Sequence, residues 1–168
     1  PVQSVPGHAV PSLAAGSHER RFPDDIVRTY EIISLCLARG LSKLGIHAHL
    51  AKAGAFHKKT DRTPSCFAEP AGKELLVAGR KICGSAQIRS HGGFLQQGSL
   101  LMTFDPAQTA ALIRSAEPPE GWRSRVAGVN ELVSPSVSPE TLCEALLAGF
   151  CEELGVDVVP GELTPEEQ

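Results

Sequence analysis

Two residues of opposite chemical character, Cys66 and Lys81, are the strongest candidates for catalysis in this sequence. Cys66 follows a polar loop, and Lys81 comes fifteen residues later, where one expected strand turns into the next. A cysteine attacks a carbonyl carbon as its thiolate, and a nearby ammonium group favours the thiolate. We therefore predict that both side chains belong to one acyl-transfer site, although neither residue alone would support this assignment.

A run of small residues follows Lys81 on the expected strand. Gly84, Ser85 and Ala86 stand in succession there, and Gly98 stands on the next strand. Glycine inside a strand often marks the close approach of a ligand or of another backbone. Composition favours a slot for a slender substrate and a bulge or tightly packed helix about equally.

Metal and phosphate chemistry have weaker support in the sequence. His47 and His49 alternate and could share one strand face, but no third ligand has suitable spacing, so we predict no metal site. His57 precedes Cys66 and could act as a base, although an exposed polar histidine is the commoner case. The sequence contains no GxxxxGK[ST] phosphate-binding loop.

Hydrophobic periodicity and turn residues predict the elements that position these groups. Apolar residues at three- and four-residue steps after the capping residue Asp24 predict a helix that ends at Gly45. Three apolar runs separated by glycine-containing turns predict an antiparallel meander, with Lys81 in its first turn. A second helix follows Ser138 and ends at Gly155. The other expected elements are a strand at 46–50, a loop at 51–64, meander strands at 74–78, 82–89 and 94–104, a helix at 107–114, a loop at 117–125, a helical turn at 126–132 and a strand at 156–159.

The strands cluster in the middle of the chain instead of alternating with helices, which predicts the α+β class with a mainly antiparallel sheet. Residues 1–22 show no periodicity and are expected to be irregular. The 168 residues, 42% of them hydrophobic, fit one globular domain. A net charge of −3 gives no signature of nucleic-acid binding, and no apolar run is long enough to cross a bilayer.

Five cysteines, an odd number without a CxxC pair, indicate a reduced compartment, and no signal peptide is visible, so we expect a cytoplasmic protein.

Three segments that contain the candidate residues resemble the biotin/lipoate protein ligase family, and most of all its cysteine-dependent octanoyl transferases of lipoate assembly. They are residues 65–70, 79–87 and 95–99, and Gly-Arg-Lys-x-x-Gly-Ser-Ala-Gln in the second is specific to the family. The resemblance implies a mixed sheet flanked by helices, like class II aminoacyl-tRNA synthetases and biotin ligases. It places the catalytic domain at 23–160, between the irregular segment and an acidic tail at 161–168.

The resemblance also implies an activity. Cys66 matches the nucleophile that takes an octanoyl group from acyl carrier protein, and Lys81 matches the lysine that favours its thiolate. The acceptor is a lysine of the glycine-cleavage H protein or of a lipoyl domain of a 2-oxoacid dehydrogenase. Gly84, Ser85, Ala86 and Gly98 would shape the acyl slot, and Gln97 would contact its polar end. No cofactor is needed, whereas the rival function, an ATP-dependent lipoate–protein ligase, would use ATP and Mg²⁺. A non-catalytic acyl- or protein-binding domain is the third alternative.

Three departures from the family pattern qualify these expectations. The Arg-Arg-x-Ser/Thr-Gly-Gly segment that normally precedes the first helix is absent, Gln97 stands where the family usually has histidine, and residues 71–73 replace a more aromatic stretch. We therefore expect the chain to be an N-terminally truncated domain that is weakly active or inactive alone, because missing strands would leave a sheet edge exposed.

Overall fold

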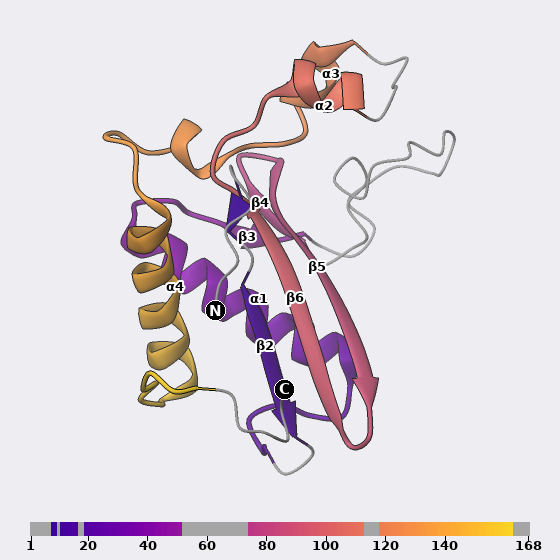
Figure 1. Ribbon diagram of the computed structural model, residues 1–168, viewed down its shortest axis with the longest axis vertical. Helices are drawn as coiled ribbons and strands as arrows, with labels where there is room; N and C mark the ends of the chain where they lie inside the picture. Colours follow the sequence, from indigo (N-terminus) through magenta and orange to yellow (C-terminus); the bar gives the residue numbers. More distant parts are fainter. Residues whose placement is uncertain (1–7, 10, 17–18, 52–73, 113–117, 163–168) are drawn as a thin grey trace.

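The computed structural model describes residues 8–9, 11–16, 19–51, 74–112 and 118–162. Within them, strands of a six-stranded sheet follow the order β1-β6-β5-β4-β3, and β2 also pairs with β6. All these pairings are antiparallel, and the helices α1 and α4 pack against one another beside the sheet, as Figure 1 shows. The predicted α+β class is therefore confirmed. The strands are β1 (His8–Ala9), β2 (Ser12–Gly16), β3 (His49–Leu50), β4 (Leu75–Val77), β5 (Arg80–Ser90) and β6 (Gly93–Leu101). The helices are α1 (Ile26–Lys43), α2 (Pro106–Leu112), α3 (Pro119–Arg123), the 3-10 helix η1 (Val129–Glu131) and α4 (Pro139–Leu154).

The two long helices begin and end close to where the sequence predicts. The carboxylate of Asp25, one residue beyond the predicted cap, accepts a hydrogen bond from the Arg28 amide at 2.8 Å. The Ser138 hydroxyl caps α4 by accepting from the Thr141 amide at 3.2 Å. Gly155 ends α4 in the left-handed region, with φ of 62°, where glycine carries no steric penalty.

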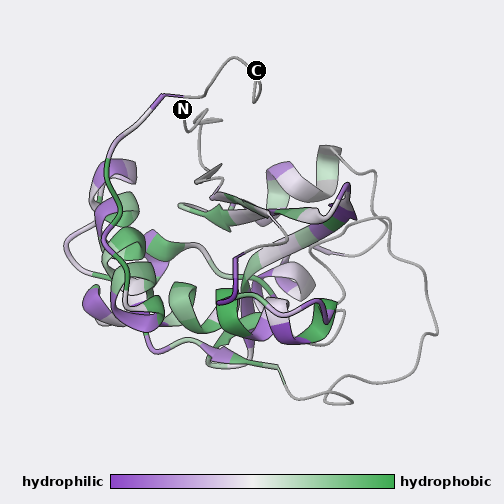
Figure 2. Cartoon of the chain, turned by 90° about the horizontal axis from the view of Figure 1, so that it is seen from below, coloured by the Kyte–Doolittle hydropathy of each residue, from purple (hydrophilic) through white to green (hydrophobic). Residues whose placement is uncertain are grey.

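The hydrophobic core lies between α1, α4 and the sheet, and Figure 2 shows hydrophobic residues where the helices meet. The two helices cross at Gly40 and Gly149, where a Cβ on Gly149 would lie 2.3 Å from the Gly40 nitrogen. Only a residue without a side chain fits there, so this glycine sets how closely α4 approaches α1. Central members of the core are Leu37, Leu41, Ile82, Leu100, Leu142 and Leu146.

The central meander of β4, β5 and β6 is confirmed, but its first turn is shorter than predicted. Ala78 and Gly79 form this turn, both at positive φ, and β5 begins at Arg80. Lys81 is therefore a strand residue and not a turn residue. The second turn uses His91 and Gly92, also both at positive φ, as a two-residue hairpin turn requires.

The N-terminal segment differs most from the prediction. Residues 12–16, expected to be irregular, form β2 and pair with β6 from Ser12–Gln97 to Gly16–Gly93. The sequence Ser-Leu-Ala-Ala-Gly carries one large apolar residue and so gives almost no periodic signal, and the strand is stabilised by its partner instead.

Three further predictions need correction. β3 covers only His49–Leu50 instead of 46–50, and residues 156–159 form no strand. The expected loop at 117–125 contains the short helix α3, which carries the fully buried Trp122. Burial of this large ring explains why a segment with a loop-like composition has ordered structure.

Candidate active site

Lys81 is buried at the start of β5 and paired with a carboxylate. Its side chain is 2% exposed, and its Nζ lies 2.6 Å from Oε1 of Glu74, which is 14% exposed and immediately precedes β4. An ammonium group removed from water needs such a counter-charge to remain charged. The structure therefore fixes the predicted catalytic lysine through an ion pair that the sequence analysis did not identify.

The backbone of Lys81 is fixed as firmly as its side chain. Its amide donates to the Arg125 carbonyl at 2.7 Å, and its carbonyl accepts from the Ala127 amide at 2.9 Å. These bonds form an isolated parallel bridge between Lys81 and Val126, while Leu76 of β4 pairs with Lys81 on the other side. The start of β5 thus lies between two neighbouring backbones.

Trp122 is bonded to this second backbone, because its carbonyl accepts from the Arg125 and Val126 amides, each at 3.0 Å. Its side chain is fully buried, and the Arg125 guanidinium carbon lies 5.3 Å from the centre of its ring. A guanidinium over an indole face is attracted by the ring electrons. The segment from Trp122 to Ala127 is therefore part of the Lys81 site, and the single tryptophan of the sequence was the available signal for it.

The five predicted substrate-binding residues fall on two faces of the sheet. Ser85 pairs directly with Gly98 in the β5–β6 ladder, whereas Ala86 pairs with Gln97 and Gly84 with Ser99. Neighbouring residues of a strand point to opposite faces, so Ser85 and Gly98 share one face. Gly84, Ala86 and Gln97 share the other, and the sequence analysis had grouped all five in a single slot.

The face of the sheet to which Lys81 belongs cannot be found by counting alternate residues back from Ser85, because the β4–β5 pairing is irregular between them. The β4–β5 register shifts between Leu75 and Leu76, which pair with Cys83 and Lys81 respectively. The extra residue, Ile82, is fully buried and belongs to the same core cluster as Cys83. A bulge of this kind changes the direction of the side chains that precede it.

Gly98 lies close to the chain segment that precedes β2. Its amide donates to the Pro11 carbonyl at 2.8 Å, which draws the chain before β2 close to β6. A Cβ at Gly98 would lie 3.3 Å from Ser85 Oγ, 3.5 Å from Pro11 Cγ and 3.6 Å from Cys83 Sγ. Two of these distances are ordinary van der Waals contacts and the one to Ser85 is slightly tight, so the described surroundings do not require a glycine at this position.

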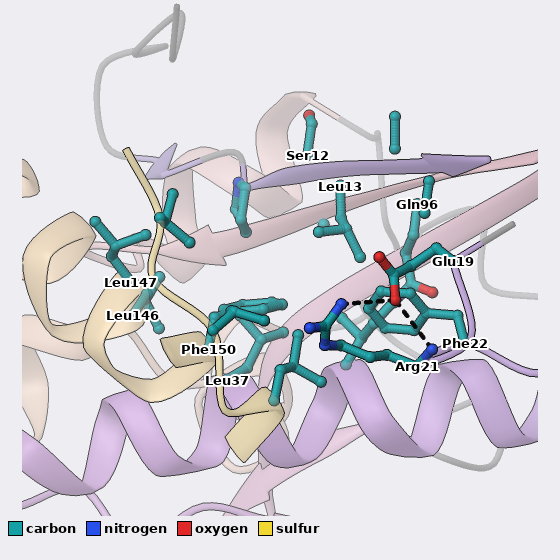
Figure 3. Close-up of a pocket in the computed structure, with 18 of the residues that line it drawn as sticks. Ser12, Leu13, Glu19, Arg21, Phe22, Leu37, Gln96, Leu146, Leu147 and Phe150 are labelled. Carbon is teal, nitrogen blue, oxygen red and sulfur yellow. Dashed lines mark hydrogen bonds and ion pairs between the residues drawn. The ribbon is translucent and has the colours of Figure 1, made fainter. Parts of the chain in front are cut away.

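A cavity of about 630 Å³ lies on the helix-facing side of β2 and β6. Figure 3 shows Leu13 of β2 opposite Leu37 of α1, with Leu146 and Phe150 of α4 beside them. Ser85 and Gly98 also line this cavity. Its walls are mainly apolar, as a site for a hydrocarbon ligand would require.

Besides the predicted Ser85, the polar residues that line the cavity include Gln96, Glu19 and Arg21, which the prediction did not name. Gln96 is 3% exposed, and its side-chain Oε1 accepts a hydrogen bond from the side-chain Nε2 of Gln87 at 2.8 Å. Gln97, which the prediction did name, lies on the opposite face of the sheet. Glu19 and Arg21 form an ion pair of 2.9 Å in the cavity wall.

The predicted nucleophile, Cys66, lies outside the described residues, as does His57. Four other cysteines are free thiols. Burial raises the pKa of Cys36 to about 12 and that of Cys83 to about 11, and it also raises the pKa of Cys143. A thiol with a raised pKa is a poor nucleophile at neutral pH, so none of these three replaces Cys66 as the candidate.

Two functional features are absent from the described ranges. No group of three or more His, Cys, Asp or Glu residues there could hold a metal ion. None of the helices in those ranges is long and apolar enough to cross a bilayer.

Comparison with known proteins gives the site a family context. Residues 6–151 match the family described as the lipoyl protein ligase A/B catalytic domain. The chain belongs to this family. A relative in Kyrpidia tusciae, named octanoyltransferase LipM, is 38% identical over 157 residues, which cover 87% of this chain and 57% of the relative. The chain thus spans a little over half the length of this relative.

Solved structures confirm the fold expected for a lipoyl ligase domain. The bipartite lipoate protein ligase of Thermoplasma acidophilum, described with its E2 lipoyl domain, matches with a TM-score of 0.72 at 21% identity, over 96% of this chain and 56% of that one. Biotin protein ligase from Aquifex aeolicus, in complex with biotin and ATP, matches with a TM-score of 0.57 at 12% identity, over 89% and 50%. The predicted relation to both ligase types is therefore confirmed at the level of fold.

Proposed function

We propose that this domain transfers an octanoyl group from acyl carrier protein to a protein lysine through a thioester on Cys66. The observation that carries the proposal is the likeness to octanoyltransferase LipM, together with a cysteine and a lysine at the spacing of the resemblance. The buried Lys81 ammonium supports it, because a thiolate nucleophile needs a nearby positive charge.

The proposed reaction has two acyl-transfer steps. The Cys66 thiolate attacks the octanoyl carbonyl, a new carbon–sulfur bond forms, and the carrier thiolate leaves with the electrons of the old bond. The acceptor amine then attacks the same carbon, loses a proton as the amide forms, and releases the Cys66 thiolate. Lys81 favours the thiolate and offers its ammonium to the negative oxygen that develops in each step.

This route needs no cofactor, because the thioester is already an activated acyl group. The acceptor that we propose is a lysine of a lipoyl domain or of the glycine-cleavage H protein. The free thiols of the described cysteines suit the reducing cytoplasm, where we place the reaction.

Intact-mass measurement after incubation with octanoyl-acyl carrier protein tests the proposal. We expect a hydroxylamine-sensitive octanoyl adduct that disappears in Cys66→Ser and persists in the matched control Cys143→Ser. An adduct that survives Cys66→Ser would contradict the assignment. Lysine acylation of a lipoyl domain that depends on ATP would identify the ligase function, and binding without transfer would identify a non-catalytic domain.

A further inference from the structure

The Glu74 carboxylate forms an ion pair with the Lys81 ammonium, and nothing above assigns it a role in the reaction. The two groups are 2.6 Å apart and nearly buried. Glu74 immediately precedes β4, and Lys81 is the second residue of β5. A pair of this kind behaves electrically as a near-neutral unit, because each charge offsets the field of the other. Lys81 cannot therefore act on a neighbouring thiol with the full strength of an isolated ammonium.

The buried thiol of Cys83 already responds to both members of the pair. Burial is the main cause of its raised pKa, and a hydrogen bond with Ser85 lowers it. Beyond these effects, the Lys81 charge lowers the Cys83 pKa and the Glu74 charge raises it. The two charges thus oppose each other at a sulfur atom within the same site.

Other charged and titratable groups around the pair are engaged with different partners. Arg80 pairs with Glu131 of η1 at 3.3 Å, and Arg125 lies over the Trp122 ring. From α1, the Tyr30 hydroxyl donates to the Ser85 carbonyl, and burial, with a contribution from Glu74, raises its pKa. Glu74 is therefore a carboxylate whose charge bears directly on Lys81.

We propose that Glu74 is a positioning residue for acyl transfer. Its carboxylate holds the Lys81 ammonium in place and offsets part of the positive charge, so that a cationic acceptor lysine can approach. The inference rests on the proposed function. Its physical basis lies in the second substrate, because a lysine side chain in solution is positively charged. A bare buried ammonium would favour the Cys66 thiolate more strongly but would repel the incoming acceptor, whereas the paired ammonium allows both steps.

The two steps should therefore respond to loss of the carboxylate in opposite directions. In Glu74→Gln, the amide retains a hydrogen-bond acceptor for Lys81 but removes the negative charge. We expect the pH midpoint for alkylation of Cys66 by iodoacetamide to fall by about one unit, the size of effect that a neighbouring charge produces. We expect the octanoyl-enzyme to transfer to the lysine of a lipoyl domain about ten-fold more slowly.

The matched control is Glu131→Gln. It removes a carboxylate from the adjacent Arg80 pair, while its amide oxygen can still accept the Gly128 amide hydrogen that Glu131 Oε1 accepts at 3.3 Å. The control should leave the alkylation midpoint unchanged. Glu74→Asp keeps the charge and should also retain the midpoint, but it should slow both steps because the shorter side chain displaces Lys81.

Peptide mass mapping of the full chain measures alkylation at Cys66 separately from the other cysteines, and circular dichroism confirms that each variant is folded. A merely structural role would slow both steps together with no change in midpoint, and that result would overturn the inference. So would a lowered midpoint in Glu74→Asp equal to that in Glu74→Gln. If Glu74→Gln does not fold, Glu74→Ala removes the same charge: a lowered midpoint is expected, and an unchanged midpoint would overturn the inference.

The proposed function and this inference fail in different ways. Absence of any octanoyl adduct on the unaltered chain would refute octanoyl transfer, while the alkylation midpoint would still measure the influence of Glu74 on Cys66. Normal octanoyl transfer with an unchanged midpoint in Glu74→Gln would refute the role of Glu74 alone.

Discussion

Replacing Lys81 by methionine should destabilise the fold mainly through the charge that it leaves behind. Methionine fills much of the same volume, so the cost comes from Glu74, whose carboxylate would lose its counter-ion at 2.6 Å. Removing one member of a fully buried pair costs about 3–5 kcal/mol. Because Glu74 is 14% exposed and retains some access to water, we expect the lower end, about 3 kcal/mol.

This loss should depend on pH in a direction that follows from the charge. Without the Lys81 ammonium, the nearly buried Glu74 carboxylate is less favourable when ionised than when protonated, so protonation of Glu74 stabilises the native state of Lys81→Met. The destabilisation should therefore be largest at about pH 8 and should shrink as the pH falls towards about 5. A loss caused by poor packing of methionine would be the same at both values.

Urea unfolding of four proteins measures the effect: the unaltered chain, Lys81→Met, Glu74→Gln and the double variant. We expect the double variant to recover about 2 kcal/mol relative to Lys81→Met, since it no longer contains a nearly buried carboxylate that has lost the Lys81 ammonium. The slope of free energy against urea should remain constant across the set. Additive single and double effects at both pH values would refute the reasoning.

Two more predictions concern the helix crossing and the buried thiols. Gly149→Ala should lower the free energy of unfolding by about 2–3 kcal/mol, because its Cβ would lie 2.3 Å from the Gly40 nitrogen, and thermal melting should detect this. Gly161→Ala, with nothing within 4 Å of its Cβ, is the control and should melt with the unaltered chain. Cys83, with a pKa of about 11, should resist iodoacetamide in the folded protein at about pH 8 and react once urea unfolds it, as peptide mass mapping would show. Equal reactivity in both states would contradict its burial.

The sequence predicts those parts of the fold whose signals are local. The helices α1 and α4 follow from apolar spacing and from the residues that cap them, and the meander follows from its glycine turns. β2 could not be predicted, because its small residues form a strand only against β6. Such long-range pairing leaves no periodic pattern in a short segment.

Some residues of the candidate site could be predicted from the sequence, but their arrangement could not. The sequence identifies Lys81, whereas the contact with Glu74 depends on the exact length of the turn at Ala78 and Gly79. The division of Gly84 and Ser85 between two faces follows from strand alternation, once the register with β6 is known. The register itself is a tertiary property.

The backbone of Lys81 connects parts of the chain that are far apart in sequence. Its amide and carbonyl bond to residues 125 and 127, while its side chain contacts Glu74, so the ammonium is fixed only when both segments have docked. A partly folded chain has no such fixed charge. Under the proposed function, activation of Cys66 would therefore require the complete fold, so that an incompletely folded chain would not take up the acyl group.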